Sequence, residues 1–403
     1  MSPILGVEFD QVLTNSGNLQ RPFVAPQLVR LSSITALETA LLKIVKANRE
    51  YEEWFRAKLT VVDADLDIKH AKMLANEFAF LRATYFRWAQ LFPELCQKLC
   101  DAPEVLAVAD LHVEQFSTWR DSEGRLVWGI NDFDECYPLP YTNDLVRLAT
   151  SASKAIEIGD LQISLTKACE VILAGYLSGI ERGGMPFVLE DNQPKLRTMA
   201  VGRLGDPAAY WTKLQTQMKP VDKATVPDDA IAAMSALMPP AVANLQLFSR
   251  VAGAGSLGRQ RFVMVGQYMG GRIIRECKAL LPSAAAWARG DDKTESLLQT
   301  VLQRAIRCKD PFLETYGNWV VRRLAPDCSR IELSSLPKVR DESLLLKAMG
   351  FETANIHLGT PGARQAILED LQARSDWLVK AVRDMSQAIR DDHQEWCARK
   401  DEP

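Results

Sequence analysis

The spacing of apolar residues predicts helices towards both ends of the chain. Leu37, Leu41 and Ile44 recur at helical spacing within a predicted helix over residues 33–59, and a second helical pattern covers residues 67–91. From Glu104 onwards the pattern becomes that of short strands. VLAVAD is followed by FSTWRDSEGRLVWGIND, which is typical of a strand, a turn and a strand. Helical spacing returns over residues 143–180.

A second region of strands surrounds a glycine-rich loop. LQLFSRVA, RQRFVMVGQY and RIIRECKAL have the β-branched and aromatic content of strands, and GAGSLG separates the first two. Before this region, residues 182–228 are rich in Gly and Pro and predict an irregular connection with a short helix over 210–218. After it we expect a helix over 283–306 interrupted near Gly290, short strands at 319–324 and 330–333, and helices over 341–397.

These changes of pattern predict an α+β fold with four regions. Residues 1–103 form an N-terminal helical region, and residues 104–228 combine the first strands with helices. Residues 229–340 hold the glycine-rich loop, its sheet and the following helix, and residues 341–403 form a C-terminal helical region.

Composition and charge exclude several classes of protein. The chain has 403 residues, of which 47% are apolar and 25% are charged, with only 22 Gly and 20 Pro, so collagen-like and disordered classes are excluded. The formal net charge of −3 gives no field that would favour nucleic acid or an anionic membrane as partner.

Localisation follows from the N-terminal residues, the apolar runs and the cysteines. The first ten residues have no Lys or Arg, unlike a secretory signal, and Pro239-Pro240 interrupts the longest uncharged run, residues 230–249. Eight scattered cysteines fit reduced thiols better than a disulfide framework. We therefore expect a cytoplasmic protein without a membrane partner.

Acidic residues at the ends of the first strands are candidates for catalysis. In ADLHVEQF and NDFDE, Asp110 can act as a general base, Asp132 as the principal ligand of Mg²⁺, and Gln115 can offer its amide oxygen to the same ion. The alternative is that Asp110 caps a turn and that the DFDE cluster is a solvated hairpin end. Asp144, in the first turn of a predicted helix, is expected to be structural.

The glycine-rich loop is a candidate for binding phosphate. Gly253, Gly255, Ser256 and Gly258 allow backbone N–H groups to approach phosphate oxygens, and Lys278 on a neighbouring strand adds a positive charge. A dinucleotide-binding fold would need a helix directly after the glycines, whereas the order strand, loop, strand, turn, strand with Lys is that of the phosphate-covering sheet of protein kinases. A plain hairpin with a solvent-reaching lysine is the alternative.

A lysine in this role needs a carboxylate that holds it. Glu295, 17 residues beyond Lys278, is the candidate, and Glu276 on the same strand face is the competing partner. Arg82 and Arg322-Arg323 lie beside apolar residues and could face phosphate, although ordinary salt bridges explain them equally well. Asn355 and His357 could also line a site.

Several segments resemble a known bacterial family. FAFLRATYF, VADLHVEQFSTWRDSEGRLVWGINDFDE, YTNDLVRLATS, RVAGAGSLGRQRFV, RECKALLPSA and ETANIHLG resemble the family catalogued as domain of unknown function 2252, from about residue 70 to residue 370. In its GDxHxxNF and NDFDE segments that family is similar to aminoglycoside-phosphotransferase-like members of the protein-kinase-like superfamily. The resemblance implies that Asp110 stands at the catalytic aspartate and Asp132 at the magnesium-holding aspartate.

The sequence departs from that pattern in two residues and in the order of its parts. Ala109 replaces the usual glycine, and Gln115 replaces the asparagine expected as second metal ligand. Asp110 and Asp132 also precede the glycine loop, whereas they follow it in protein kinases. We therefore predict a two-lobed protein-kinase-like fold with circularly permuted motif order and extensive added helices.

The leading functional hypothesis is an ATP- and Mg²⁺-dependent phosphotransferase acting on an unidentified small-molecule or protein hydroxyl acceptor. One alternative is a nucleotide-binding scaffold or regulatory protein without catalysis, because Ala109 and Gln115 depart from the pattern. A second alternative is a nucleotidyl (AMP) transferase, because the same parts could present the α-phosphorus to the acceptor.

Overall fold

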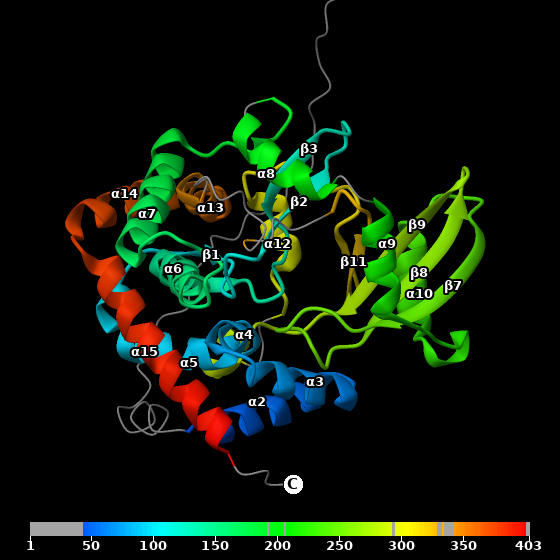
Figure 1. The fold of residues 1–403 in the computed structure, drawn as a ribbon, viewed down its shortest axis with the longest axis horizontal. Helices are drawn as coiled ribbons and strands as arrows, with labels where there is room; N and C mark the ends of the chain where they lie inside the picture. Colours follow the sequence, from blue (N-terminus) through cyan, green and yellow to red (C-terminus); the bar gives the residue numbers. More distant parts are fainter. Residues whose placement is uncertain are drawn as a thin grey trace, which may run out of the picture.

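A helical body and a six-stranded antiparallel sheet make up the part of the chain that the computed structural model describes (Figure 1). The described residues are 43–191, 193–204, 207–291, 295–328, 333 and 342–399. The helices are α2 (Ile44–Lys58), α3 (Asp63–Met73), α4 (Glu77–Ala83), α5 (Tyr85–Leu95), α6 (Tyr141–Glu157), α7 (Leu165–Arg182), α8 (Pro194–Leu204), α9 (Pro207–Thr216), α10 (Asp228–Ala236), α11 (Ala284–Ala288), α12 (Leu298–Arg304), α13 (Glu342–His357), α14 (Ala363–Ala373) and α15 (Trp377–Ala398), with short 3-10 turns η1 (Gln97–Leu99) and η2 (Lys223–Thr225).

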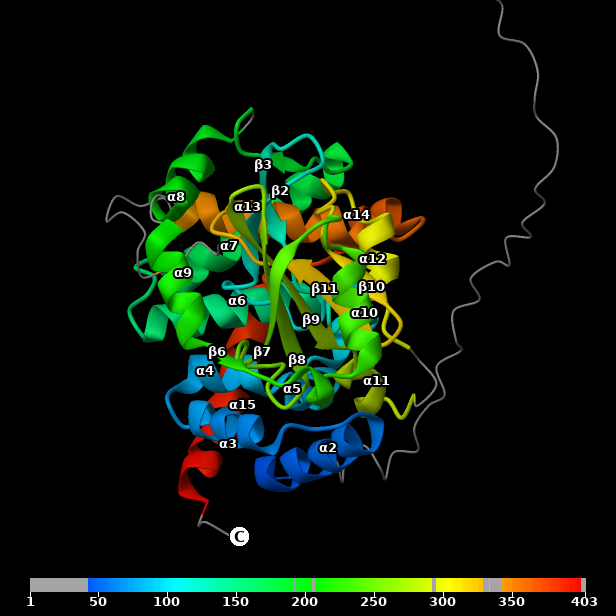
Figure 2. The same cartoon turned by 90° about the vertical axis from the view of Figure 1, so that its right-hand side faces the viewer.

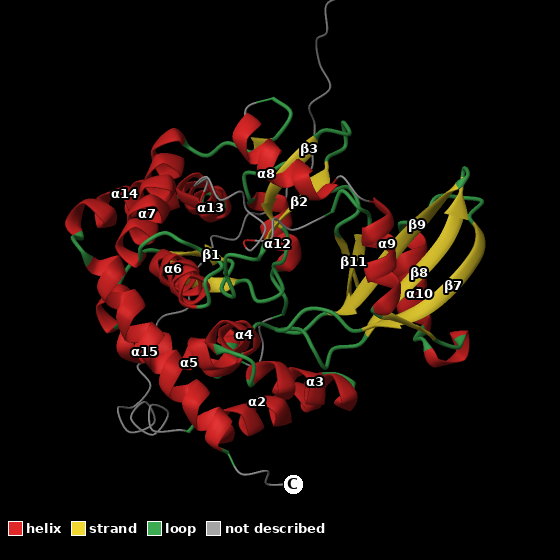
Figure 3. Cartoon of the chain, viewed as in Figure 1, coloured by secondary structure: helices red, strands yellow, loops and turns green. Residues whose placement is uncertain are grey.

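The strands form three sheets in the described residues. They are β1 (Glu104–Ala107), β2 (Phe116–Arg120), β3 (Leu126–Ile130), β4 (Tyr137–Pro140), β5 (Phe187–Val188), β6 (Met218–Pro220), β7 (Ala243–Arg250), β8 (Arg261–Tyr268), β9 (Gly271–Ala279), β10 (Glu314–Tyr316) and β11 (Trp319–Arg323). The strand orders are β1-β4, β2-β3-β5 and β10-β11-β9-β8-β7-β6. Figure 3 shows the large sheet on one side of the molecule and most helices on the other.

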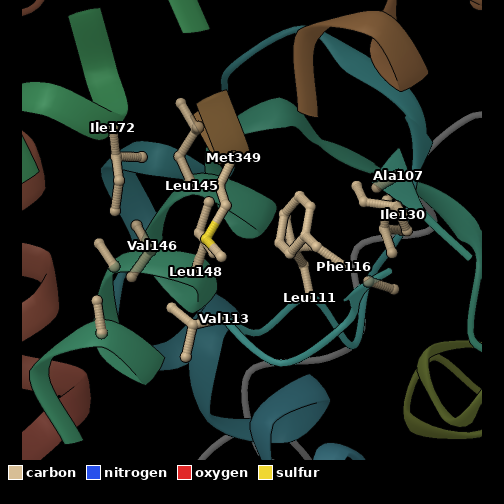
Figure 4. Close-up of a cluster of buried hydrophobic side chains, with 14 of the residues drawn as sticks. Ala107, Leu111, Val113, Phe116, Ile130, Leu145, Val146, Leu148, Ile172 and Met349 are labelled. Carbon is tan, nitrogen blue, oxygen red and sulfur yellow. The ribbon is translucent and has the colours of Figure 1, made fainter. Parts of the chain in front are cut away.

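The core of the helical body supports the loop that follows β1. Buried side chains from the strands and loops around Asp110 pack against α6, α7 and α13 (Figure 4). They include Ala107, Leu111, Val113, Phe116, Ile130, Leu145, Val146, Leu148, Ile172 and Met349. Burial of so many apolar side chains holds this loop in one place, because each stabilises the fold by about 1.5–3 kcal/mol.

Two glycines allow α7 and α13 to pack closely in this core. A Cβ atom at Gly350 would overlap the backbone of Ile172, and one at Gly175 would overlap the backbone of Lys347. Only glycine permits this approach, because any larger side chain would push the helices apart.

The large sheet is covered on both faces by helices (Figure 2). Phe262 and Met264 of β8 pack with α10, whereas Val263, between them, packs with Leu214 of α9. This alternation follows from the period of two in a strand. Arg261 and Lys278, at the opposite end of β8 and β9 from the hairpin tip, are paired in register.

The first described helices contact the glycine loop. Val62, between α2 and α3, donates its backbone N–H to the carbonyl of Gly258 at 2.9 Å. A Cβ at Gly258 would lie 2.7 Å from Leu66 Cδ2 and 3.0 Å from Phe55 Cε1. The loop is therefore held by helices that are distant in sequence.

The α+β class predicted from the sequence is confirmed, with differences in individual elements. The helix expected over 67–91 is α3, α4 and α5, because Asn76 caps a new helix by accepting from the N–H of Ala79 at 2.8 Å. The helix expected over 283–306 is interrupted and forms only α11 and α12. Strands β4, β5, β6 and β10 and helix α8 were not predicted. Part of the predicted helix 33–59 and most of the predicted strand 330–333 lie outside the described residues.

The kinase-like architecture and the permuted motif order stay predictions.

Among the described residues, no helix has both the length and the apolar character needed to cross a membrane.

Candidate active site

Two neighbouring cavities lie where the loops after β1 and β3 meet the large sheet. The first, here called the loop cavity, encloses about 480 Å³, partly open to solvent, and is lined by Arg82, Asp110, His112, Gln115, Asp132, Asp134, Glu135, Gly253, Ala254, Gly255, Ser256 and Arg259. The second, the sheet cavity, has about 310 Å³ of empty space, also partly open to solvent, and is lined by Asn131, Asp132, Phe133, Asp134, Glu276, Lys278, Leu298, Leu313, Val320 and Arg322. Asp132 and Asp134 line both.

The carboxylate of Asp110 is held by Arg147 of α6. Arg147 is fully buried, and its Nε donates to Asp110 Oδ1 at 3.0 Å, with a second contact from Nη2 to the same oxygen. Its guanidinium lies 4.9 Å from the ring centroid of Tyr85 and 5.0 Å from that of Trp88. Burial raises the pKa of Asp110 to about 7, an effect that Arg147 opposes and the nearby carboxylate of Glu135 reinforces.

The carboxylate of Asp144 holds the backbone just before Asp110. The N–H groups of Val108 and Ala109 donate to the two Asp144 carboxylate oxygens at 2.7 and 2.9 Å, and His357 Nε2 lies 3.0 Å from Oδ2. The structural role expected for Asp144 is confirmed, although the N–H groups belong to the loop rather than to its own helix. His357 is completely buried and does not line either cavity.

Gln115 lies at the loop cavity, but its amide connects two loops. Its Oε1 accepts from the backbone N–H of His112 at 3.2 Å, and its Nε2 donates to the carbonyl of Asp132 at 3.0 Å. The structure thus gives Gln115 a positioning contact between the Asp110 and Asp132 loops. Its expected role as a metal ligand stays a prediction.

Lys278 reaches the acidic loop across the sheet. Its ammonium group forms an ion pair with Asp134 and lies 3.8 Å from Asp132 Oδ1. The acidic loop after β3 and the strand that carries Lys278 are therefore in contact, although Asp134 and Lys278 are 144 residues apart in sequence.

The carboxylate partner expected for Lys278 was wrong. Glu295 is exposed in the segment before α12 and lines neither cavity. Asp134 takes its place because the loop after β3 comes closer to the lysine than the segment before α12 does. The competing candidate, Glu276, is instead surrounded by arginines: Arg261 Nη1 and Arg322 Nε each donate to its Oε1 at 2.7 Å.

Most of the glycine loop faces the loop cavity. Gly253, Gly255 and Ser256 line it, and a Cβ at Gly255 would lie 3.3 Å from Asp110 Oδ2. Gly253 has a φ of +77°, in the left-handed region that favours glycine. Gly258 was expected to face phosphate but packs against α2 and α3 and is not part of the lining.

Sequence reasoning missed several charged residues of the site. Arg259, directly after the glycine loop, donates to Asp134 at 3.2 Å and to Glu135 at 2.8 Å, and Glu135 also accepts from the N–H of Ala284 at 2.7 Å. The sequence could have predicted Asp134 and Glu135, because they belong to the acidic NDFDE segment, and Arg259, because it directly follows the glycine loop. It could not have predicted Arg147, because nothing in the pattern of its helix indicates which side chain it contacts. Arg82 lines the loop cavity and is paired with Glu114 at 2.5 Å, as an ordinary salt bridge would be.

Comparison with known proteins covers one part of the chain. Residues 61–185 match the model of a family described as an uncharacterized protein conserved in bacteria, DUF2252. The DUF2252 stretch includes Asp110, Gln115 and Asp132 but neither the glycine loop nor Lys278. No curated protein and no solved structure matches this chain. Among the described residues, no group of three or more His, Cys, Asp or Glu side chains is arranged to hold a metal ion.

Proposed function

We propose that the protein is an ATP- and Mg²⁺-dependent phosphotransferase that acts on a hydroxyl acceptor. The observation that carries the proposal is the convergence of Asp110, Asp132 and the glycine loop on one cavity, with Lys278 3.8 Å from Asp132. A base, a metal-binding carboxylate, a glycine-rich cradle and a lysine are the parts that phosphoryl transfer requires.

Asp110 is suited to act as the general base. A catalytic base works best when its pKa is close to the working pH, and burial raises the pKa of Asp110 to about 7. Arg147 holds the carboxylate through Nε at 3.0 Å, so that its second oxygen can face the acceptor hydroxyl. A Cβ atom at Gly255 of the glycine loop would lie 3.3 Å from that second oxygen.

The glycine loop and the cations beside it fit a polyphosphate. Gly253 and Gly255 leave room for phosphate oxygens to approach the backbone N–H groups. Lys278 and Arg259 share the carboxylate of Asp134. Either cation can therefore also donate N–H groups to a phosphate that enters the cavities.

Asp132 fits the requirements for holding a hard cation. Its side chain is 34% exposed at the junction of the two cavities, unlike the buried Asp134. Magnesium in such sites is bound by one or two carboxylates and the phosphate oxygens of the substrate, so Asp132 would hold it, with the second lone pair of Gln115 Oε1 nearby. When bound, the ion neutralises charge on the phosphates.

The proposal is tested by nucleotide binding and turnover. Calorimetric titration of ATP with and without Mg²⁺ should show Mg²⁺-dependent binding. ADP formation should fall by about 100- to 10,000-fold in Asp110→Asn and by at least about 100-fold in Asp132→Ala. The matched control is Glu123→Ala, which removes an exposed acid from the β2–β3 turn and should leave turnover unchanged. Equal turnover in all four proteins would contradict the proposal.

The products distinguish the two transfer reactions. Phosphoryl transfer leaves ADP, whereas nucleotidyl transfer leaves pyrophosphate and adds AMP to the acceptor. Mass spectrometry of the nucleotide products and of the acceptor mixture separates them.

A nucleotide-binding scaffold is the second candidate function. It is favoured by the contacts of Gln115, whose amide is used by His112 and Asp132, and by the pairing of Lys278 with Asp134. In that case ATP would bind without Mg²⁺, turnover would be absent, and Asp110→Asn would not change the dissociation constant.

A further inference from the structure

Three arginines converge on one carboxylate beside Lys278. Arg261 of β8 and Arg322 of β11 each donate to Glu276 Oε1 at 2.7 Å, and Arg250 of β7 contacts Oε2. We call Arg250, Arg261 and Arg322 the arginine cluster. Glu276, at its centre, is only 1% exposed.

The three guanidinium groups share one carboxylate. Glu276 is the acid that all three contact, while the carboxylates of Asp132 and Asp134 attract Arg322 from the side of the sheet cavity. The register adds a conflict, because Arg261 is directly opposite Lys278 on the neighbouring strand, and like charges in that position destabilise a sheet. The carboxylate that Lys278 contacts, Asp134, is already shared with Arg259. Guanidinium groups that outnumber the carboxylates they contact keep N–H groups for an anionic ligand, so the cluster is suited to binding one.

The cluster is open to the cavities on one side. Arg322 is 29% exposed and lines the sheet cavity together with Glu276 and Lys278. Arg261 Nη2 donates to Ser256 Oγ at 2.8 Å, which connects the cluster to the glycine loop. Gln217 holds the third arginine of the cluster, because its Oε1 accepts from Arg250 Nε at 3.1 Å and from Nη2 at 2.8 Å. An anion can therefore approach from the sheet cavity, next to Asp132.

We propose that the arginine cluster is an anion subsite that binds a phosphate group of the ligand in the sheet cavity. The proposal rests on the proposed function, in which the transferred phosphoryl group is bound at the loop cavity. The group bound by the arginines is then a second one, either another phosphate of the nucleotide or a phosphate carried by the acceptor. Planar guanidinium groups suit both, because they bind phosphate through paired N–H groups.

Inorganic phosphate is the probe, and its binding does not depend on catalysis. We expect the wild type to bind phosphate by calorimetry and Arg322→Gln to bind it about ten- to hundredfold more weakly, the effect of losing a charged hydrogen-bond donor. The matched control is Arg272→Gln: this exposed arginine is on the same strand as Glu276 but stacks 4.9 Å from the Trp211 ring, away from the cluster. The control should retain wild-type affinity.

A competition experiment assigns the source of the phosphate. A saturating non-hydrolysable ATP analogue should abolish phosphate binding if the subsite holds a nucleotide phosphate, and should leave it intact if the subsite holds the acceptor's phosphate. Either result supports the subsite. Both can be obtained even if the protein turns over no ATP, so failure of the proposed function is distinguishable from failure of the subsite.

Thermal unfolding separates a binding role from a structural one. Without phosphate, Arg322→Gln should melt slightly below the wild type, because it loses one of the ion pairs of Glu276, and phosphate should raise the melting temperature of the wild type more than that of the variant. Equal phosphate affinity in Arg322→Gln and Arg272→Gln, absence of phosphate binding by the wild type, or a lower melting temperature with unchanged affinity would overturn the proposal.

Discussion

Ala109 has a backbone conformation that glycine adopts more easily. It precedes Asp110, is completely buried, and has a φ of +71°, in the left-handed region. Its N–H is committed to Asp144 at 2.9 Å, so the loop cannot relax without losing that hydrogen bond. A non-glycine residue in this region is disfavoured by roughly 1–2 kcal/mol.

The variant Ala109→Gly should therefore be more stable than the wild type. The relief of strain exceeds the extra chain entropy of glycine, which costs about 0.5–1 kcal/mol, and leaves a gain of about 0.5–1 kcal/mol in the free energy of unfolding. Urea denaturation measures it. The control Ala107→Gly, in β1 just before the loop, should lose about 1 kcal/mol, because strand backbone gains nothing from glycine. A loss of stability in both variants would show that Ala109 is unstrained.

For single residues, the sequence predicted which side chains lie at the site better than it predicted which side chains they contact. Asp110, Asp132 and Lys278 were chosen from the sequence, and the structure places all three at the cavities. Glu295 was a wrong partner for Lys278 because distance along the chain does not determine which carboxylate a long side chain meets. Arg147 could not be chosen, since its contact with Asp110 depends on how α6 packs.

The glycine loop is an element whose position depends on helices from another part of the chain. Gly255 approaches Asp110, while Gly258 packs against Phe55 and Leu66 of α2 and α3. Strands β7, β8 and β9 were predictable because their alternation is local. The contact with α2 and α3 was not, because it joins segments almost 200 residues apart.

A methyl group at Gly258 should loosen the loop. Gly258→Ala places its Cβ 2.7 Å from Leu66 Cδ2 at a φ of +94°, so both crowding and backbone strain act. We expect a loss of about 2–4 kcal/mol in the free energy of unfolding, of which about 1 kcal/mol comes from the backbone. Gly270→Ala is the control, because it has a similar φ of +81° but open space around it, and it should lose only the backbone part. Equal losses measured by urea denaturation would mean that crowding at Gly258 is negligible.

For the whole molecule, two buried acids, Asp110 and Glu352, connect the site to stability. Asp110 lies at the loop cavity, and Glu352 of α13 accepts from the N–H of Ile130 at 3.2 Å and from Asn355 Nδ2 at 2.7 Å. Burial raises the pKa of each to about 7. In the unfolded chain both acids have a pKa of about 4. At a pH between about 4 and 7, both acids are therefore still protonated in the folded protein but already ionised in the unfolded chain.

This difference predicts that the protein becomes less stable as pH rises from about 4 to 7. When the unfolded state binds fewer protons than the folded state, the free energy of unfolding falls with increasing pH, here by on the order of 5–10 kcal/mol in total. Glu276 does not contribute in this window, because its arginines hold its pKa well below the usual range and it is ionised in both states.

Urea denaturation at constant ionic strength measures the slope. Asp110→Asn should flatten it, because the amide cannot titrate, while the remaining slope from Glu352 should persist. A free energy of unfolding that rises over the same range would show that these two acids are ionised in the folded protein, and would also remove the physical basis for Asp110 as a base whose pKa is near neutrality.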